Sequence, residues 1–120
     1  MIAVLFESRP KPGKMQRYLD MGAALHSQLE RFEGFISIER FKSVTDEGKL
    51  LAVSYWQDEE AVREWRNANS HRSVQRRSRD EVFDDYRLRV AAVIRDYGMF
   101  DRDEAPGDSD IMTREAERAS

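Results

Sequence analysis

The chain has 120 residues, of which 36% are charged, contains no cysteine and carries a net charge of −3 at pH 7. A single domain of this length buries roughly two-thirds of the surface that its unfolded chain exposes, so a second domain does not fit. Without cysteine, a disulfide framework, a thiolate nucleophile and a cysteine metal site are excluded. The N-terminal apolar run is too short for a signal peptide, and no apolar run approaches the length of a membrane span. We therefore expect a soluble, cytoplasmic protein.

The negative charge is concentrated at the C-terminal end of the sequence. Residues 101–120 carry seven acids and three arginines, which leaves the first hundred residues nearly neutral. Beyond Gly98 the apolar periodicity stops, and Pro106 and Gly107 follow. We expect one domain over residues 1–99 and an acidic, disordered tail over residues 100–120. A nearly neutral domain gives no reason to expect nucleic acid as a partner.

The first half of the chain predicts a strand, a helix and a hairpin. Residues 2–8 alternate as a strand does, and a segment rich in proline and glycine then ends it. Apolar residues recur every three or four positions from residue 14 to about residue 31, which predicts an amphipathic helix. Strands over residues 35–44 and 49–56 are joined by a polar turn and form the hairpin.

The second half predicts two helical pieces and a last strand. Acids at positions 58–60 suit the positive end of the dipole of a helix that contains Trp65. Asn69 and Ser70 are suitable caps for a further helix, which begins near His71 and runs to about residue 85. The last strand is expected over residues 87–97.

The resulting order, βαββαβ, predicts an α+β protein with a ferredoxin-like, four-stranded antiparallel sheet and both helical segments on one face. The other face then carries an apolar area too large to leave in water, and sheet-to-sheet packing with a second copy is the economical cover. We therefore expect a homodimer, with some polar side chains in the covered space. The apolar residues assigned to this uncovered face are Ala3, Leu5, Phe35, Phe41, Leu50, Ala52, Trp56 and Val93, and the polar ones are Ser37, Glu39, Ser54 and Arg89.

Several segments together resemble the antibiotic biosynthesis monooxygenase domain family. They are FES followed by PKPGK near the N-terminus, GFISIERF in the second expected strand, SYW at the end of the third, and DEEAVREW with the RN after it. The resemblance covers residues 1–99. It implies a ferredoxin-like fold that pairs into a dimeric α/β barrel, in a family that includes cofactor-free quinone-forming oxygenases, heme-degrading enzymes and proteins without demonstrated chemistry.

The heme-degrading branch of that family resembles the chain at Trp65, which matches a pocket tryptophan. Two other positions depart from the branch, since Ser8 stands in place of an asparagine and Gln75 in place of the iron-binding histidine. A glutamine amide is a poor substitute for imidazole as an iron ligand. Because His71 lies nearly a full helical turn before Gln75, the resemblance disfavours heme degradation, and we expect no cofactor.

A cofactor-free oxygenase needs a pocket that excludes water, aromatic walls and a base that converts a phenolic substrate into the phenolate that reacts with oxygen. His71 is the candidate base because its unperturbed pKa lies nearest neutrality, and Asn67 or Arg72 would steady the developing charge. The candidate catalytic residues are therefore His71, Trp65 and Asn67, and the candidate substrate-binding residues are Tyr55, Trp56, Phe41, Phe83 and Arg72, with no metal ligands.

Plainer interpretations of the same residues stay open. Trp65 fits the apolar face of its helix as a core residue, and His71 fits a surface position at a helix start. The arginines between positions 72 and 79 are followed by acids three and four residues on, which is typical of a salt-bridged helix face. The leading hypothesis is a homodimeric monooxygenase that acts without metal or flavin on an aromatic or quinol-type molecule. The alternative is a non-enzymatic module that binds a small ligand in the dimer pocket.

Overall fold

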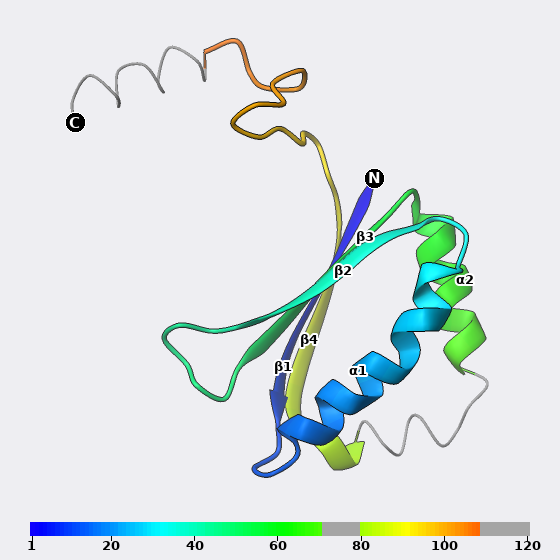
Figure 1. Ribbon diagram of the computed structural model, residues 1–120, viewed down its shortest axis with the longest axis vertical. Coiled ribbons are helices and arrows are strands. Elements are labelled where there is room, and N and C mark those ends of the chain that lie inside the picture. Colours follow the sequence, from blue (N-terminus) through cyan, green and yellow to red (C-terminus); the bar gives the residue numbers. More distant parts are fainter. Residues whose placement is uncertain (71–79, 109–120) are drawn as a thin grey trace.

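The computed structural model describes residues 1–70 and 80–108, and its strands and helices follow the predicted βαββαβ order (Figure 1). The predicted boundaries of the first three strands and of the first helix lie within two residues of the observed ones. The elements are β1 (Ile2–Pro10), α1 (Met15–Glu30), β2 (Phe35–Lys42), β3 (Leu50–Trp56), α2 (Glu59–Ser70) and β4 (Phe83–Ala92).

The four strands form one antiparallel sheet in the order β2-β3-β1-β4. Ile2 of β1 stands opposite Trp56 of β3 on one side and Ala92 of β4 on the other, which fixes the register of the three strands. Because crossovers between parallel strands share one hand, both helices lie on the same face of the sheet, as Figure 1 shows. The predicted ferredoxin-like arrangement is confirmed.

The two helices begin in different ways. α1 follows a turn in which Gly13 has a φ of +80°, and Lys14, at its N-cap, makes no side-chain cap hydrogen bond. α2 is capped by Asp58, whose Oδ1 accepts a hydrogen bond of 2.8 Å from the backbone N–H of Ala61. Two acids in the first turn of α2, at positions 59 and 60, also suit the positive end of its dipole. The start predicted from the acids at 58–60 is confirmed.

Two clusters of buried residues fill the space between the helices and the sheet. One cluster joins Tyr18 of α1 to Leu50, Val82 and Phe83, with Phe6 packed against it. The other joins Leu29, Trp56 and Ala61, and partly buried residues that include Ile2, Val4, Phe32, Phe35, Ile38, Val62 and Trp65 pack around it. Both helices are therefore held to the sheet by aromatic side chains.

The prediction of which face of β3 is uncovered is wrong. Leu50, Ala52 and Trp56 lie opposite Ser8, Phe6 and Ile2, so they share the face that the helices cover, and all three are buried. Phe35 and Ser54 also lie on the helix-covered face. Phe35 stands opposite Trp56 in the pairing of β2 with β3, and Ser54 stands opposite Val4 in the pairing of β3 with β1. β3 is apolar on both faces, so its period of two does not indicate which face meets the helices.

The face without helices, here called the open face, consists of the alternate residues of the four strands. Its larger apolar members are Leu5, Phe41, Leu51, Val53 and Tyr55, and Ala3, Ala91 and Val93 share it, as the strand register shows. Of the residues assigned to this face from the sequence, Ala3, Leu5, Phe41 and Val93 are correctly placed, as are Ser37, Glu39 and Arg89.

The last strand lies earlier in the chain than the periodicity predicts. β4 begins at Phe83, opposite Pro10, and the ladder ends where the N–H of Val93 donates to the carbonyl of Met1. Residues 80–82 are helical, and the part of the later helix predicted over 71–79 lies outside the described residues. The strand ends early because β1 is its one neighbour and offers no further partner.

Beyond β4, residues 93–108 continue as an arm, and residues 109–120 lie outside the described part of the chain. The division into a domain over 1–99 and a disordered tail over 100–120 therefore stays a prediction.

Candidate functional site

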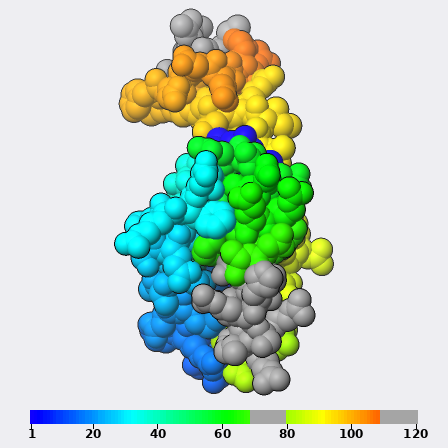
Figure 2. All heavy atoms as spheres, turned by 90° about the vertical axis from the view of Figure 1, so that its right-hand side faces the viewer, coloured from blue at the N-terminus to red at the C-terminus, as the bar shows by residue number. Residues whose placement is uncertain are grey.

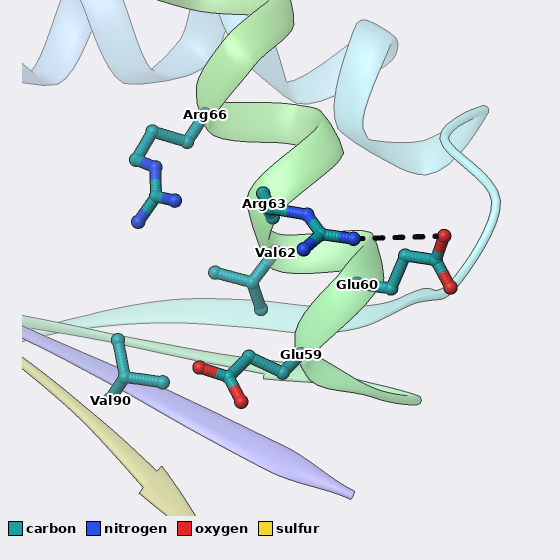
Figure 3. Close-up of a pocket in the computed structure, with 6 residues that line it drawn as sticks. All are labelled: Glu59, Glu60, Val62, Arg63, Arg66 and Val90. Carbon is teal, nitrogen blue, oxygen red and sulfur yellow. Dashed lines mark ion pairs between the residues drawn. The ribbon is translucent and has the colours of Figure 1, made fainter.

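A groove lies between α2 and β4 on the face of the sheet that carries the helices (Figure 3). Its volume is about 270 Å³. Its lining combines two apolar and four charged side chains, which are Val62 and Val90, and Glu59, Glu60, Arg63 and Arg66. The groove is therefore large enough for a small organic molecule and offers both kinds of contact.

The spacing of the α2 residues explains why they share this groove. Positions 59, 62, 63 and 66 recur at steps of three and four, which places them on one face of the helix. The cap at Asp58 fixes where that face begins. In Figure 3, Glu59 and Val62 point from α2 toward Val90, whereas Arg63 points toward Glu60 on the outer side.

The strand side of the groove belongs to an apolar stripe on β4. Tyr86, Leu88 and Val90 stand opposite Ser8, Phe6 and Val4 of β1, so all three face the helix layer. They are nevertheless 50%, 53% and 44% exposed, and β4 is an edge strand of the sheet. An apolar stripe of this kind beside a groove provides a surface for a ligand ring.

The charged lining of the groove consists of two glutamates, Glu59 and Glu60, and two arginines, Arg63 and Arg66. Arg63 Nη2 lies 3.9 Å from Glu60 Oε1 in an exposed ion pair. Arg66 is exposed and lines the same groove, and no described residue pairs with it. A guanidinium binds a carboxylate or phenolate through charge-assisted hydrogen bonds.

The tryptophan pair is linked to the groove through Val62. Trp65 and Trp56 have ring centroids 6.3 Å apart, and Phe32 stacks edge-on against Trp65 at 5.3 Å. Val62 lines the groove and also packs against the cluster that contains Trp56. The indole Nε1 of Trp56 donates a hydrogen bond of 2.9 Å to Ser54 Oγ, so this ring is fixed in place. The rings themselves do not line the groove, so a ligand there would meet Val62, which packs against this aromatic cluster.

The structure brings together some of the predicted site residues and separates others. Trp65 and Trp56 meet, while Phe83 belongs to the other buried cluster, with Tyr18. Tyr55 and Phe41 lie on the open face, on the other side of the sheet from the tryptophans. Asn67 is on an exposed part of α2, where it takes part in an interaction.

Three residues of the sequence-based site proposals lie outside the described residues, namely His71, Arg72 and Gln75. Ser8, which replaces the asparagine of the heme-degrading branch, is buried on the helix side of β1. Its Oγ has no hydrogen-bond partner within the described ranges.

The groove-lining residues were missed by the sequence analysis. The signal on α2 is the recurrence of residues 59, 62, 63 and 66 on one helix face, but this spacing alone does not distinguish a groove from a solvent-exposed face. No pattern in the sequence around Val90 indicates that it lines the groove, because β4 and α2 are brought together by the order of the strands in the sheet. Elsewhere in residues 1–70 and 80–108, no three His, Asp or Glu side chains gather as a metal site. No helix in these ranges is long and apolar enough to span a membrane.

Two curated relatives match this chain over part of their length. A protein of Pyricularia oryzae named jasmonate monooxygenase ABM is 40% identical over 93 residues, which is 78% of this chain and 43% of the relative. The uncharacterised protein YqjZ of Bacillus subtilis is 31% identical over 62 residues, which is 52% of this chain and 53% of that protein. The chain thus spans about half the length of the curated relatives it matches.

Solved structures share the fold of this chain at low sequence identity. A candidate antibiotic biosynthesis monooxygenase from Deinococcus radiodurans superimposes with a TM-score of 0.69, covering 83% of this chain and 99% of its own, at 8% identity. An identity this low shows the shared fold alone. The family model for antibiotic biosynthesis monooxygenases matches residues 1–77, which comprise β1 to α2 and therefore the helical wall of the groove. The chain belongs to the antibiotic biosynthesis monooxygenase family.

Proposed function

We propose that this protein is a cofactor-independent monooxygenase that oxidises a small aromatic or quinol-type molecule bound in the groove between α2 and β4. The observation that supports this proposal is the combination of an apolar floor, Val62 and Val90, with a neighbouring tryptophan pair and an exposed arginine, Arg66. A flat apolar ring gains from burial against the valines, and an anionic end gains from the guanidinium.

The name of one relative supports a substrate with an anionic end. The Pyricularia oryzae protein is named for jasmonate, and the name denotes a carboxylate. Because the match covers 43% of that relative, it guides the chemical class of the substrate and does not identify it. A phenolate and a carboxylate present oxygen acceptors of the same kind to Arg66.

For a phenolic substrate, the reaction needs no external reductant. A base removes the phenol proton, and the electron-rich ring then reacts with molecular oxygen. One oxygen atom stays on the ring as a new carbonyl, and the second leaves as water with the two hydrogens that the substrate loses. The protein then has to bind the ring, remove one proton and exclude bulk water.

We assign these tasks to residues in and next to α2. His71 directly follows α2 in the sequence and is proposed as the base, because imidazole accepts a proton near neutral pH. Asn67 and Arg72 are proposed to steady the developing negative charge, and Trp65 to form part of the wall. Phe83, Tyr55 and Phe41 do not line this groove. The open-face residues Tyr55 and Phe41 are proposed to contact a substrate only in a pocket between two copies.

We further propose that the working unit is a homodimer formed through the open face. Large apolar side chains on this face, among them Phe41 and Tyr55, are 45% and 36% exposed in the single copy. Packing two such faces together removes this surface from water and places Tyr55 and Phe41 at the interface. A pocket shared between two copies is one way in which these two residues reach a substrate.

Oxygen uptake with a panel of phenols, quinols and jasmonate tests the proposed function. We expect consumption of oxygen with at least one compound and incorporation of one labelled oxygen atom into the product. Arg66→Met should raise KM about tenfold, because a charge-assisted hydrogen bond is lost. Arg31→Met, which removes the same charge at an exposed position at the end of α1, should leave KM unchanged.

The His71→Ala variant tests the assignment of the base. We expect kcat to fall by about a hundredfold or more, the range measured for lost general bases, with KM nearly unchanged. Saturable binding of panel compounds without any oxygen uptake would overturn the enzymatic proposal and favour a binding module. A spectral shift with hemin that His71→Ala abolishes would instead favour a heme-dependent enzyme.

A further inference from the structure

Beyond β4 the chain continues as an arm, residues 93–108, which runs away from the sheet and from both helices (Figure 1). In the space-filling view of Figure 2 the arm stands above the body of the protein, in yellow and orange. It leaves the sheet at Val93, whose N–H donates to the carbonyl of Met1 at 3.0 Å. The arm is thus a direct extension of the edge strand β4.

The arm has a defined shape of its own. The backbone N–H of Asp96 donates to Glu104 Oε2 at 2.8 Å, and the N–H of Gly98 donates to the carbonyl of Asp101 at 2.8 Å. The guanidinium of Arg102 lies 5.2 Å from the centre of the Tyr97 ring and donates to the carbonyl of Gly98. These contacts fold the arm back on itself, so it is a preformed hook and not an extended tail.

Three large apolar side chains of this hook are exposed to water. Ile94 is 89% exposed, Met99 is 79% exposed and Phe100 is 92% exposed. Large apolar side chains that are this exposed to water are typical of a surface that another protein covers. Because the arm runs away from its own sheet and helices, the body of the same subunit does not cover them in this conformation.

We propose that the arm of each subunit packs, through Ile94, Met99 and Phe100, against the second copy in the homodimer, so that the two arms are exchanged reciprocally. This inference rests on the homodimer of the proposed function. A second copy is the partner because the arm continues β4, whose Ala91 and the following Val93 lie on the open face. A copy packed on that face is the first surface that the arm meets, and two-fold symmetry applies the same contact to the other arm.

The exchange explains why an ordered hook carries its apolar residues outward. A preformed segment loses little conformational entropy when it binds, so most of the burial of its side chains contributes to association. Truncation of one such anchor in a protein interface typically costs enough to weaken binding at least tenfold. The arms should therefore set the affinity of the dimer, while the open face sets its geometry.

Sedimentation equilibrium of an Ile94→Asp, Phe100→Asp double variant tests the arm. We expect its dimer dissociation constant to rise at least tenfold over the wild type. Val44→Asp is the matched control, because Val44 is 99% exposed and lies in the β2–β3 turn, at the end of the sheet away from Val93. An unchanged dissociation constant in the double variant would overturn the exchange.

Crosslinking gives a second, direct readout. Because the chain has no cysteine, Phe100→Cys takes a single benzophenone label, and mixing with an isotopically heavy unlabelled chain separates crosslinks within one subunit from those between two. We expect products that join position 100 to the second copy. Crosslinks confined to the same subunit would refute the exchange while leaving the dimer intact, whereas a wild-type monomer would refute the dimer itself.

Discussion

At the scale of single residues, polar side chains inside the helix–sheet layer are accommodated in different ways. Arg40 of β2 passes beneath α1, with its guanidinium carbon 5.7 Å from the centre of the Tyr18 ring. It occupies the space that Gly22 leaves open, since a β-carbon there would stand 2.6 Å from Arg40 Nη2. The Nε of Arg40 has no hydrogen-bond partner among the described residues. A glycine on the buried side of α1 thus admits a cation into this layer.

Arg9 and Asp46 join the end of β1 to the β2–β3 turn. Arg9 Nη1 donates a hydrogen bond of 3.0 Å to Asp46 Oδ1, and its other terminal nitrogen contacts the second oxygen. The hydrogen bond from Arg9 lowers the pKa of the Asp46 carboxyl, although partial desolvation acts in the opposite direction. The same hydrogen bond raises the pKa of the Arg9 guanidinium.

Asp46→Asn should lower the free energy of unfolding at neutral pH. A carboxyl whose pKa is lowered by folding stabilises the protein above the ordinary carboxyl pKa, about 3.9, and loses this contribution as the pH falls through the folded value. The difference between variant and wild type should therefore be small, because the pair is exposed, and should disappear in acid. Urea unfolding across this pH range measures it, with Glu47→Gln as the charge-matched control. A difference that persists unchanged in acid would contradict the pairing.

At the scale of elements, the start of α2 is fixed against the turn that precedes β2. Gly34 has a φ of +89°, and a β-carbon on it would stand 2.5 Å from the β-carbon of Ala61. The carbonyl of Gly34 also accepts a hydrogen bond of 2.8 Å from the N–H of Gln57. Together with the cap at Asp58, these contacts position the helix that forms one wall of the groove.

Gly34→Ala should destabilise the protein by about 3 kcal/mol, since it combines left-handed backbone strain with a clash in a packed contact. Gly13→Ala separates the two effects, because Gly13 has a φ of +80° and open space around its α-carbon. That control should cost about 1 kcal/mol from backbone strain alone. Both values come from urea unfolding.

Adding Ala61→Gly to Gly34→Ala should restore part of the lost stability by removing the clash, and the double-mutant cycle measures how much. Equal losses in the two single glycine variants would show that Gly34 and Ala61 are not in close contact.

At the scale of the whole molecule, the two faces of the sheet differ in what covers them. The helices cover the face that bears Trp56 and Leu50, whereas Leu5, Leu51 and Val53 remain only partly buried on the open face. Charged residues border this apolar centre, where Glu7 pairs with Arg89 at 3.1 Å and with Lys49 at 3.5 Å. An apolar centre with a charged rim is the usual anatomy of a protein–protein interface.

Val53→Lys should convert the proposed dimer into a monomer. A lysine at the centre of the open face would bring two charges together without partners when two copies pack, and this costs several kcal/mol. Light scattering should give twice the chain mass for the wild type and the single-chain mass for the variant. Val44→Lys, which introduces the same charge in the exposed β2–β3 turn, should leave the mass at that of the dimer. A wild-type protein of single-chain mass would contradict the homodimer.

Local patterns in the sequence determined most of the fold. The period of two in the first three strands, the apolar recurrence in α1 and the acids before α2 predicted these elements to within about two residues, because backbone propensity and burial act over neighbouring positions. The same patterns predicted that helices cover one face of the sheet. The interpretation of Trp65 as a core residue on the apolar face of its helix agrees with its contacts with Trp56 and Phe32.

Only the tertiary structure decided which face of β3 meets the helices, where β4 begins and which residues line the groove. β3 is apolar on both sides, so its face is set by its pairing with β1, in which Ile2 stands opposite Trp56. Consecutive strand residues point to opposite faces, which separates Tyr55 from Trp56 within one chain. Arg66 and Val90 meet at one groove because the sheet order places β4 beside β1 on the side that α2 overlooks. Such contacts join distant segments, and no local pattern records them.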